Sequence, residues 1–143
     1  MHSSAYPHLK TILIEEFKNS TVQYGLEEEF SNKLTDYFNA DGRLKVVNIN
    51  SDSILSGEIL DYENKIFSYD ENGIEEYKVS ILFKITFSDL KRNEVIWQKD
   101  NLVLNETWSA SGEFTEFKSE EETQQQIIQD LFDQILKNSL EQW

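Results

Sequence analysis

Residue types that commonly carry out chemistry are scarce in this sequence. The chain has no cysteine and two histidines, His2 and His8, both close to its beginning. A disulfide, a thiolate metal site and a thiol nucleophile are therefore excluded, and no third imidazole or thiol accompanies the histidines. No serine lies in a G-x-S-x-G motif, which is the usual setting of an α/β-hydrolase nucleophile. We accordingly predict no metal site and no cofactor.

Carboxylates are the one abundant group. The chain holds 27 Asp and Glu against 13 Lys and Arg, a net charge of −14, which disfavours binding to nucleic acid. Glycoside hydrolysis needs two carboxyl groups about 5 to 9.5 Å apart, so a carbohydrate hydrolase that works at acidic pH is one hypothesis. Because no spacing selects a pair, solvated acidic faces are the simpler interpretation.

The stretch TILIEEFKNSTVQYGLEEEF, residues 11–30, has the layout of a nucleotide-binding turn. An apolar strand leads through a polar loop to a helix that begins with a glycine. Phosphate binding at such a turn requires closely spaced glycines and the positive end of the helix dipole. Here there is one glycine, and Glu27, Glu28 and Glu29 occupy the first helical turn. We therefore interpret the turn as a helix cap.

Two predicted hairpin tips supply the candidate contact residues. Asn72-Gly73 tolerates the positive φ angles of a tight turn, and its segment DENG lacks the ligand spacing of a calcium loop. Lys91 and Arg92 lie together at the next tip, where they can contact a ligand phosphate or keep the turn solvated. Aromatic residues exceed the need of a small core and favour an interface as well as packing: Trp97, Trp108, Trp143, Tyr62, Tyr69 and Tyr77.

The order of predicted elements indicates one α+β domain. Apolar residues spaced by three and four predict two amphipathic helices, and alternating residues predict strands with one buried face. We expect a four- to five-stranded mixed, mostly antiparallel sheet with both helices packed on one face. Residues 1–8 are predicted to be a flexible tail or an added remnant, and residues 9–143 the domain. The helices are predicted at 25–38 and 120–140, and the strands at 11–17, 44–49, 53–69, 77–87 and 94–108.

Two details of the strands are also predicted. Ile12 and Ile14 are expected on one face of the first strand, with Leu13 and Phe17 available to the other. Gly57 interrupts the strand at 53–69, which usually marks a bulge or a close approach of two backbones.

Several stretches together resemble the LptE family of lipopolysaccharide-assembly lipoproteins. YPHLKTILIEEFKNST followed by GLEEEFSNKL resembles the opening of that family, in which a strand and an F-x-N loop lead into a helix. RLKVVNINSDSILSGEILDYE is similar to its middle strand. SYDENGIEEYKVSILFKITFSDLKRNEVIWQ is similar to its long hairpin. The resemblance covers roughly residues 6–140, and it depends on the order and spacing of these motifs.

The resemblance implies a function that is not enzymatic. Members of that family are anchored by a lipidated N-terminal cysteine to the periplasmic side of the outer membrane. They plug the LptD β-barrel, help it to fold, and are reported to bind lipopolysaccharide. The partners implied are therefore an LptD-like barrel and lipopolysaccharide, with the membrane reached only through a lipid anchor that this chain does not include. Asn72, Gly73, Lys91 and Arg92 are the candidate contacts.

A second function class remains open. The N-terminal domain of TolB and the accessory domains of curli secretion also begin with a strand, a phenylalanine-asparagine loop and a helix. A periplasmic scaffold or regulatory lipoprotein of that type is therefore the alternative. The long antiparallel meander predicted between residues 53 and 108 argues against it.

Overall fold

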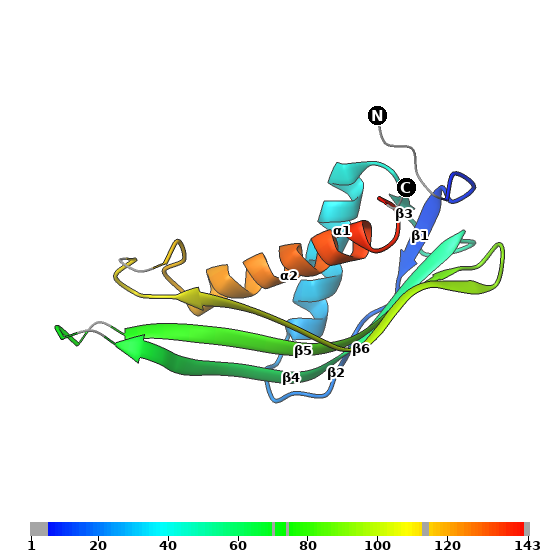
Figure 1. Cartoon of the computed structure of the whole chain (residues 1–143). Helices are drawn as coiled ribbons and strands as arrows, with labels where there is room; N and C mark the ends of the chain where they lie inside the picture. Colours follow the sequence, from blue (N-terminus) through cyan, green and yellow to red (C-terminus); the bar gives the residue numbers. More distant parts are fainter. Residues whose placement is uncertain (1–5, 70, 74, 113–114, 142–143) are drawn as a thin grey trace.

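The computed structural model describes residues 6–69, 71–73, 75–112 and 115–141. Its two helices lie together above a strongly curved sheet (Figure 1). The helices are α1 (Leu26–Asp41) and α2 (Glu120–Lys137). The strands are β1 (Thr11–Ile14), β2 (Lys18–Asn19), β3 (Lys45–Val46), β4 (Ser53–Tyr69), β5 (Glu75–Asp89) and β6 (Glu94–Trp108).

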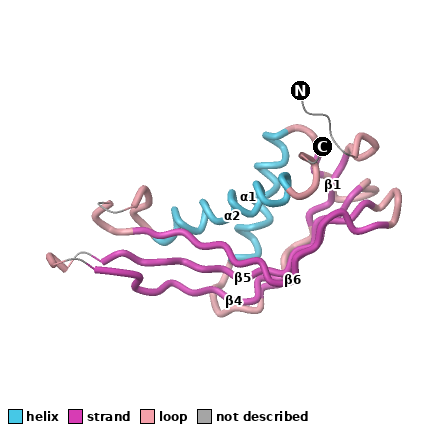
Figure 2. Tube along the Cα trace, in the orientation of Figure 1, coloured by secondary structure: helices cyan, strands magenta, loops and turns pink. Residues whose placement is uncertain are grey.

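One mixed sheet contains all the strands, in the order β3-β1-β4-β5-β6, with β2 paired to β4. Strand β1 runs parallel to β3 and β4, whereas β4, β5 and β6 form an antiparallel meander. Both helices lie on the same side of this sheet (Figure 2). The predicted α+β class is confirmed, and the sheet exceeds the expected strand number through the two-residue strand β2.

The alternation along β5 explains why the core lies on one face. Every second side chain from Val79 to Phe87 is fully buried, and the residues between them lie on the opposite face. Aromatic packing joins β5 to α1, because the ring centroids of Phe83 and Phe30 are 5.3 Å apart, with the two rings tilted relative to each other. The helices contribute the apolar stripes predicted from their spacing, and the aromatic rings of Phe38 and Phe132 meet edge to face between them.

The start of α1 depends on Asn19 rather than on an anion. The helix is preceded by Gly25, whose φ of 85° is left-handed and suits glycine. The Asn19 amide donates to the Gln23 carbonyl and to Glu27 Oε2, both at 2.8 Å. Its oxygen accepts from the backbone N–H of Thr21. The loop of the F-x-N motif is thus tied to the first turn of the helix, and Glu27 is engaged by a side chain of the same protein.

The prediction for Phe17 was wrong. The segment expected to be one strand over 11–17 leaves the sheet after Ile14, and Phe17 turns into the core, where its ring lies 5.8 Å from that of Phe30. Gly57 explains why there is room. A Cβ atom at Gly57 would lie 2.9 Å from both the Lys84 carbonyl oxygen and the Phe17 ring, so the predicted close approach is confirmed.

Candidate functional site

The two predicted hairpin tips lie at opposite ends of the sheet (Figure 1). Asn72 and Gly73 connect β4 to β5 at the end far from both termini, whereas Lys91 and Arg92 connect β5 to β6 beside the N-terminal segment. All four residues are exposed. The structure therefore does not unite them in one site, and the two ends have different chemistry.

The end with Asn72 and Gly73 is rich in exposed apolar side chains. Near the end of β4, the side chains of Ile66, Phe67 and Tyr69 are 53%, 56% and 74% exposed. Gly73 has a φ of 78°, in agreement with the positive φ expected of this turn. An exposed apolar cluster of this kind is characteristic of a contact surface.

Aromatic packing gives this end its shape. The rings of Tyr77 on β5 and Trp108 on β6 are stacked with centroids 4.5 Å apart, and the Lys78 ammonium lies 5.2 Å from the Phe67 ring centroid. The Trp108 indole donates to Asn64 Oδ1 at 3.1 Å. The surplus of aromatic residues was visible in the sequence, but the meeting of Tyr69, Tyr77 and Trp108 at this end follows from the register of three strands. Trp97 pairs with Phe87 towards the other end, and Trp143 lies outside the described residues.

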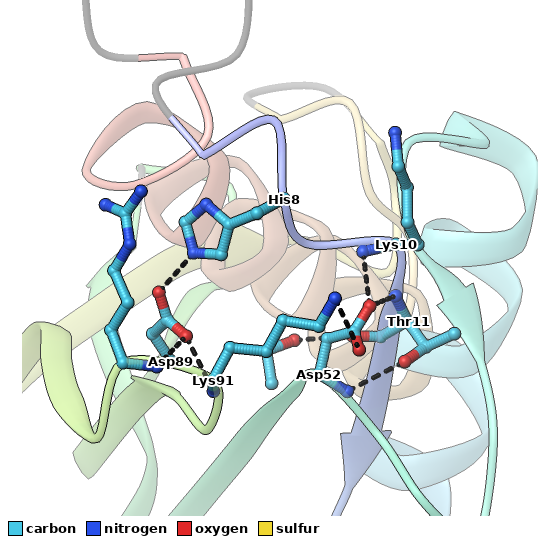
Figure 3. A network of polar contacts seen from close by, with 8 residues as sticks. His8, Lys10, Thr11, Asp52, Asp89 and Lys91 are labelled. Atoms are coloured by element: carbon cyan, nitrogen blue, oxygen red, sulfur yellow. Dashed lines mark hydrogen bonds and ion pairs between the residues drawn. The ribbon is translucent and has the colours of Figure 1, made fainter.

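The Lys91–Arg92 turn is built around a buried carboxylate. Asp89, the last residue of β5, is 0% exposed. Its Oδ1 accepts the backbone N–H groups of Lys91 and Arg92, both at 2.9 Å, and its Oδ2 lies 2.5 Å from His8 Nε2 (Figure 3). Burial by itself would raise the pKa of Asp89, but these hydrogen bonds and the nearby imidazole outweigh burial and lower it. The carboxylate thus shapes the turn.

A second carboxylate, Asp52, connects the turn to β1. Asp52 Oδ2 accepts from the backbone N–H groups of Lys10 and Thr11 at 2.7 and 3.2 Å, and Asp52 Oδ1 lies 3.6 Å from Lys91 Nζ (Figure 3). The Lys10 amide is the largest cause of the lowered pKa of Asp52. Lys91 is therefore partly engaged within the protein, whereas the Arg92 guanidinium forms no ion pair with any described residue.

The N-terminal segment is part of this network. Within the stretch predicted to be a tail, His8 contacts Asp89 and Tyr6 packs against the core. Leu9 is 4% exposed and donates its backbone N–H to the Tyr6 carbonyl. The contacts of the described chain thus begin at Tyr6. Sequence reasoning did not find the His8–Asp89 pair, because 81 residues separate its members and no motif links them.

The face of the sheet away from the helices is mostly polar. On the central strands, Ser56 pairs with Thr86 and Glu58 with Lys84, and Gln98 follows on β6. Both helices lie on the other side, so no described helix covers this face (Figure 1). Apolar residues are interspersed, with Val103 54% exposed. We call this surface the outer face.

The acidic pair formed by Glu106 and Asp130 does not resemble a hydrolase site. Glu106 on β6 is hydrogen-bonded to Asp130 on α2, which is the largest cause of the rise in the pKa of Glu106 to about 7. A glycosidase needs its two carboxyl groups further apart, with substrate between them. Ser88 and Lys91 have the S-x-x-K spacing that is found in serine β-lactamases. Lys91 Nζ, however, lies 3.6 Å from Asp52 Oδ1, so this ammonium group is paired with a carboxylate.

Neither a metal cluster nor a membrane-spanning helix is found in the described ranges. Within them, no group of three or more His, Asp and Glu side chains is arranged to hold a metal ion. No helix among these residues is long and apolar enough to cross a membrane.

Comparison with known proteins assigns a family. A model described as LptE, lipopolysaccharide-assembly, matches residues 9–139. No match was found among curated protein sequences.

Solved structures share the fold at low identity. Protein XCC0632 from Xanthomonas campestris aligns with a TM-score of 0.58 at 12% identity, covering 95% of this chain and 91% of its own. Uncharacterized lipoprotein B from Nitrosomonas europaea aligns with a TM-score of 0.54 at 17% identity, and the alignment covers 89% of this chain and 82% of that protein. Rare lipoprotein B from Shewanella oneidensis aligns with a TM-score of 0.50 at 17% identity, and the alignment covers 89% of this chain and 92% of that protein. At these identities the likeness concerns the fold.

Proposed function

The chain belongs to the LptE lipopolysaccharide-assembly family, and we propose that it acts as the non-catalytic plug and folding partner of an LptD-like outer-membrane β-barrel. The family is not enzymatic, and the family together with its lipoprotein relatives indicates an outer-membrane-associated lipoprotein with a role in lipopolysaccharide assembly. The barrel as partner, and the absence of catalysis in this chain, are part of our proposal.

The outer face is the observation that best supports the plug. The inner wall of a large membrane barrel is polar and bears charged residues, so a plug needs a polar surface that matches it. The outer face offers hydroxyl, amide and charged side chains such as Thr86, Gln98 and Lys84 on strands that no described helix covers. A sheet face of this composition gains little from burial against an apolar partner, but it can exchange hydrogen bonds with a polar wall.

The N-terminal end sets the proposed orientation. We propose that the full protein is held on the periplasmic side of the outer membrane by a lipid attached upstream of Tyr6. His8 and Leu9 fasten this part of the chain beside the Lys91–Arg92 turn. The Asn72–Gly73 end, which lies at the opposite end of the sheet, is then the part furthest from the anchor (Figure 1).

The candidate contacts follow from this orientation. Asn72 and Gly73, with the exposed aromatic residues next to them, are proposed to touch the barrel. Lys91 and Arg92 are proposed to touch the barrel or a phosphate of lipopolysaccharide. Contact with phosphate would require Lys91 Nζ to exchange its long-range pairing with Asp52 for the ligand.

A double charge reversal tests the second contact. We expect Lys91→Glu/Arg92→Glu to keep the fold, because both side chains are exposed, and to weaken binding of purified lipopolysaccharide in a titration. Lys65→Glu/Lys99→Glu, which makes the same change in charge elsewhere on exposed strand positions, is the control. Equal affinity of the Lys91/Arg92 variant and the wild type would reduce these residues to solvation of the turn. In a separate experiment, failure of the wild-type domain to associate with an LptD-like barrel would favour the scaffold alternative.

A further inference from the structure

The N-terminal end of the molecule has a charge balance unlike the rest of the chain. This end comprises residues 6–11, 41–54, 88–95 and 138–141, which meet around β1, β3 and the β5–β6 turn (Figure 1). These segments contain five Lys and Arg and five Asp and Glu, whereas the rest of the chain contains eight against 22. The whole excess of negative charge therefore lies away from this end.

Three cations of this end point to solvent, while two of its five carboxylates, Asp52 and Asp89, are held inward. Asp52 and Asp89 accept hydrogen bonds from backbone amides and have side chains 17% and 0% exposed. Lys10, Lys45 and Arg92 are exposed and form no ion pair with a described residue. Arg43 pairs with Asp41 and Glu141, so among the described residues of this end three exposed cations without an ion pair face one such carboxylate, Glu94.

Contacts hold these three cations around one end of the sheet. The Lys45 backbone N–H donates to the Lys10 carbonyl oxygen at 3.0 Å, because Lys45 lies on β3 next to β1. The Arg92 backbone N–H donates to Asp89, which also contacts His8, two residues before Lys10. Figure 3 shows the contact between Asp89 and His8. The cations thus project from an ordered framework and not from a flexible tail.

Two exposed apolar side chains accompany the cations. Ile49, in the loop after β3, is 68% exposed, and Leu90, next to Lys91 in the β5–β6 turn, is 43% exposed. Basic residues beside exposed aliphatic ones are characteristic of surfaces that lie at a membrane interface, where the cations meet phosphates and the apolar groups enter the headgroup region. A free phosphate ion would use only the cations.

We propose that this end of the molecule lies against an anionic phospholipid bilayer, with Lys10, Lys45 and Arg92 on headgroup phosphates and Ile49 and Leu90 at the headgroup boundary. The inference rests on the outer-membrane location proposed above, and it adds a membrane contact made by the folded domain itself. Because the remaining surface is strongly acidic, an anionic bilayer repels other orientations and selects this end. The contact would orient the domain relative to the membrane before it meets the barrel.

Vesicle co-sedimentation of the chain tests this directly. We expect binding to vesicles of phosphatidylcholine with phosphatidylglycerol, and loss of that binding at high salt or with phosphatidylcholine alone. Each cation near an anionic membrane contributes about 1 kcal/mol, so Lys10→Gln/Lys45→Gln/Arg92→Gln should weaken partitioning about a hundredfold. Ile49→Ser/Leu90→Ser should weaken it too, without changing its salt dependence.

A matched triple variant is the control. Lys65→Gln/Lys99→Gln/Lys118→Gln removes three exposed cations away from this end and should bind like the wild type. Equal losses in both triple variants would overturn the proposal, as would equal binding to neutral vesicles or no binding at all. Binding to lipopolysaccharide aggregates but not to phospholipid would overturn it in favour of a glycolipid site. The assay contains no barrel, so its failure leaves the proposed plug function to be tested separately.

Discussion

Replacing Asp89 with alanine should destabilise the domain and release its N-terminal segment. The carboxylate accepts two backbone N–H groups at 2.9 Å and lies 2.5 Å from His8 Nε2, and it is 0% exposed. A hydrogen bond to a charged group contributes about 1.5 to 3 kcal/mol. Taking the low end, and allowing water to reach the freed amides of an exposed turn, we expect Asp89→Ala to cost about 3 kcal/mol. That is a large part of the stability of a small domain, which is about 5 to 15 kcal/mol.

Urea unfolding measures the global loss, and tryptic cleavage after Lys10 measures the local one. Asp89→Asn keeps an acceptor for the two amides and should cost less, about 1 kcal/mol. His8→Ala should accelerate the cleavage, because the segment then loses its contact with Asp89. In His8→Ala, a further Asp89→Asn change should cost less than it does in the wild type, since the two residues interact directly.

The pH dependence of this effect has a definite sign. The pKa of Asp89 is lowered in the folded state, so the stability that Asp89 contributes is present above its unfolded-state pKa and is lost as pH falls through the folded-state value. The difference between wild type and Asp89→Ala should therefore shrink in acid. Asp100→Ala, at an exposed position on β6, is the control and should change stability by less than about 0.5 kcal/mol. An equally small effect of Asp89→Ala at neutral pH would refute the reasoning.

Three further substitutions test other parts of the structure. Phe83→Asp should prevent folding, because it leaves an unpaired charge on the fully buried face of β5, and a cooperative thermal transition like that of the wild type would contradict this placement. Glu106→Gln should flatten the pH dependence of urea stability: the raised pKa, about 7 against 4.5, means that the wild type loses stability as pH rises between these values. After allowance for solvent screening we expect the variant to gain about 1 kcal/mol at pH 8, and an unchanged pH profile would contradict the raised pKa of Glu106. Gly57→Ala should cost about 1 to 3 kcal/mol, because its Cβ would meet the Lys84 carbonyl and the Phe17 ring, and wild-type stability would argue against that close approach.

Long, periodic elements were predictable from the sequence. Apolar residues alternate along β5 from Tyr77 to Phe87, and they form a stripe over several turns of each helix. Because these patterns are long, the local pattern and the burial in the folded protein agree. A glycine inside a strand pattern also predicted a close approach at Gly57, and the structure has it.

Features decided by long-range packing were not predictable. Strand β1 stops at Ile14 because Phe17 turns into the space beside Gly57, a contact between residues 40 apart in the chain. The two-residue strands β2 and β3 are too short to show a period. Helix α2 ends at Lys137, earlier than its apolar stripe suggests, and Leu140 is still buried beyond it.

The candidate site shows the same division. Asn72-Gly73 and Lys91-Arg92 were recognisable as hairpin tips from local turn chemistry. Their placement at opposite ends of one sheet follows from the meander, and the contacts of Asp89 and Asp52 with the N-terminal segment depend on side chains that meet only after folding. Carboxylates are so numerous in this chain that their abundance concealed the two that organise one end of the molecule.

The most direct test of the central claim is co-expression of this domain with the LptD-like barrel from the same genome, followed by detergent extraction and size-exclusion chromatography. The proposed plug predicts one stable complex with one copy of each chain, and faster proteolysis of the barrel when the domain is left out. Two separate peaks, with the domain itself folded by circular dichroism, would contradict the plug and favour a periplasmic scaffold that shares only the fold.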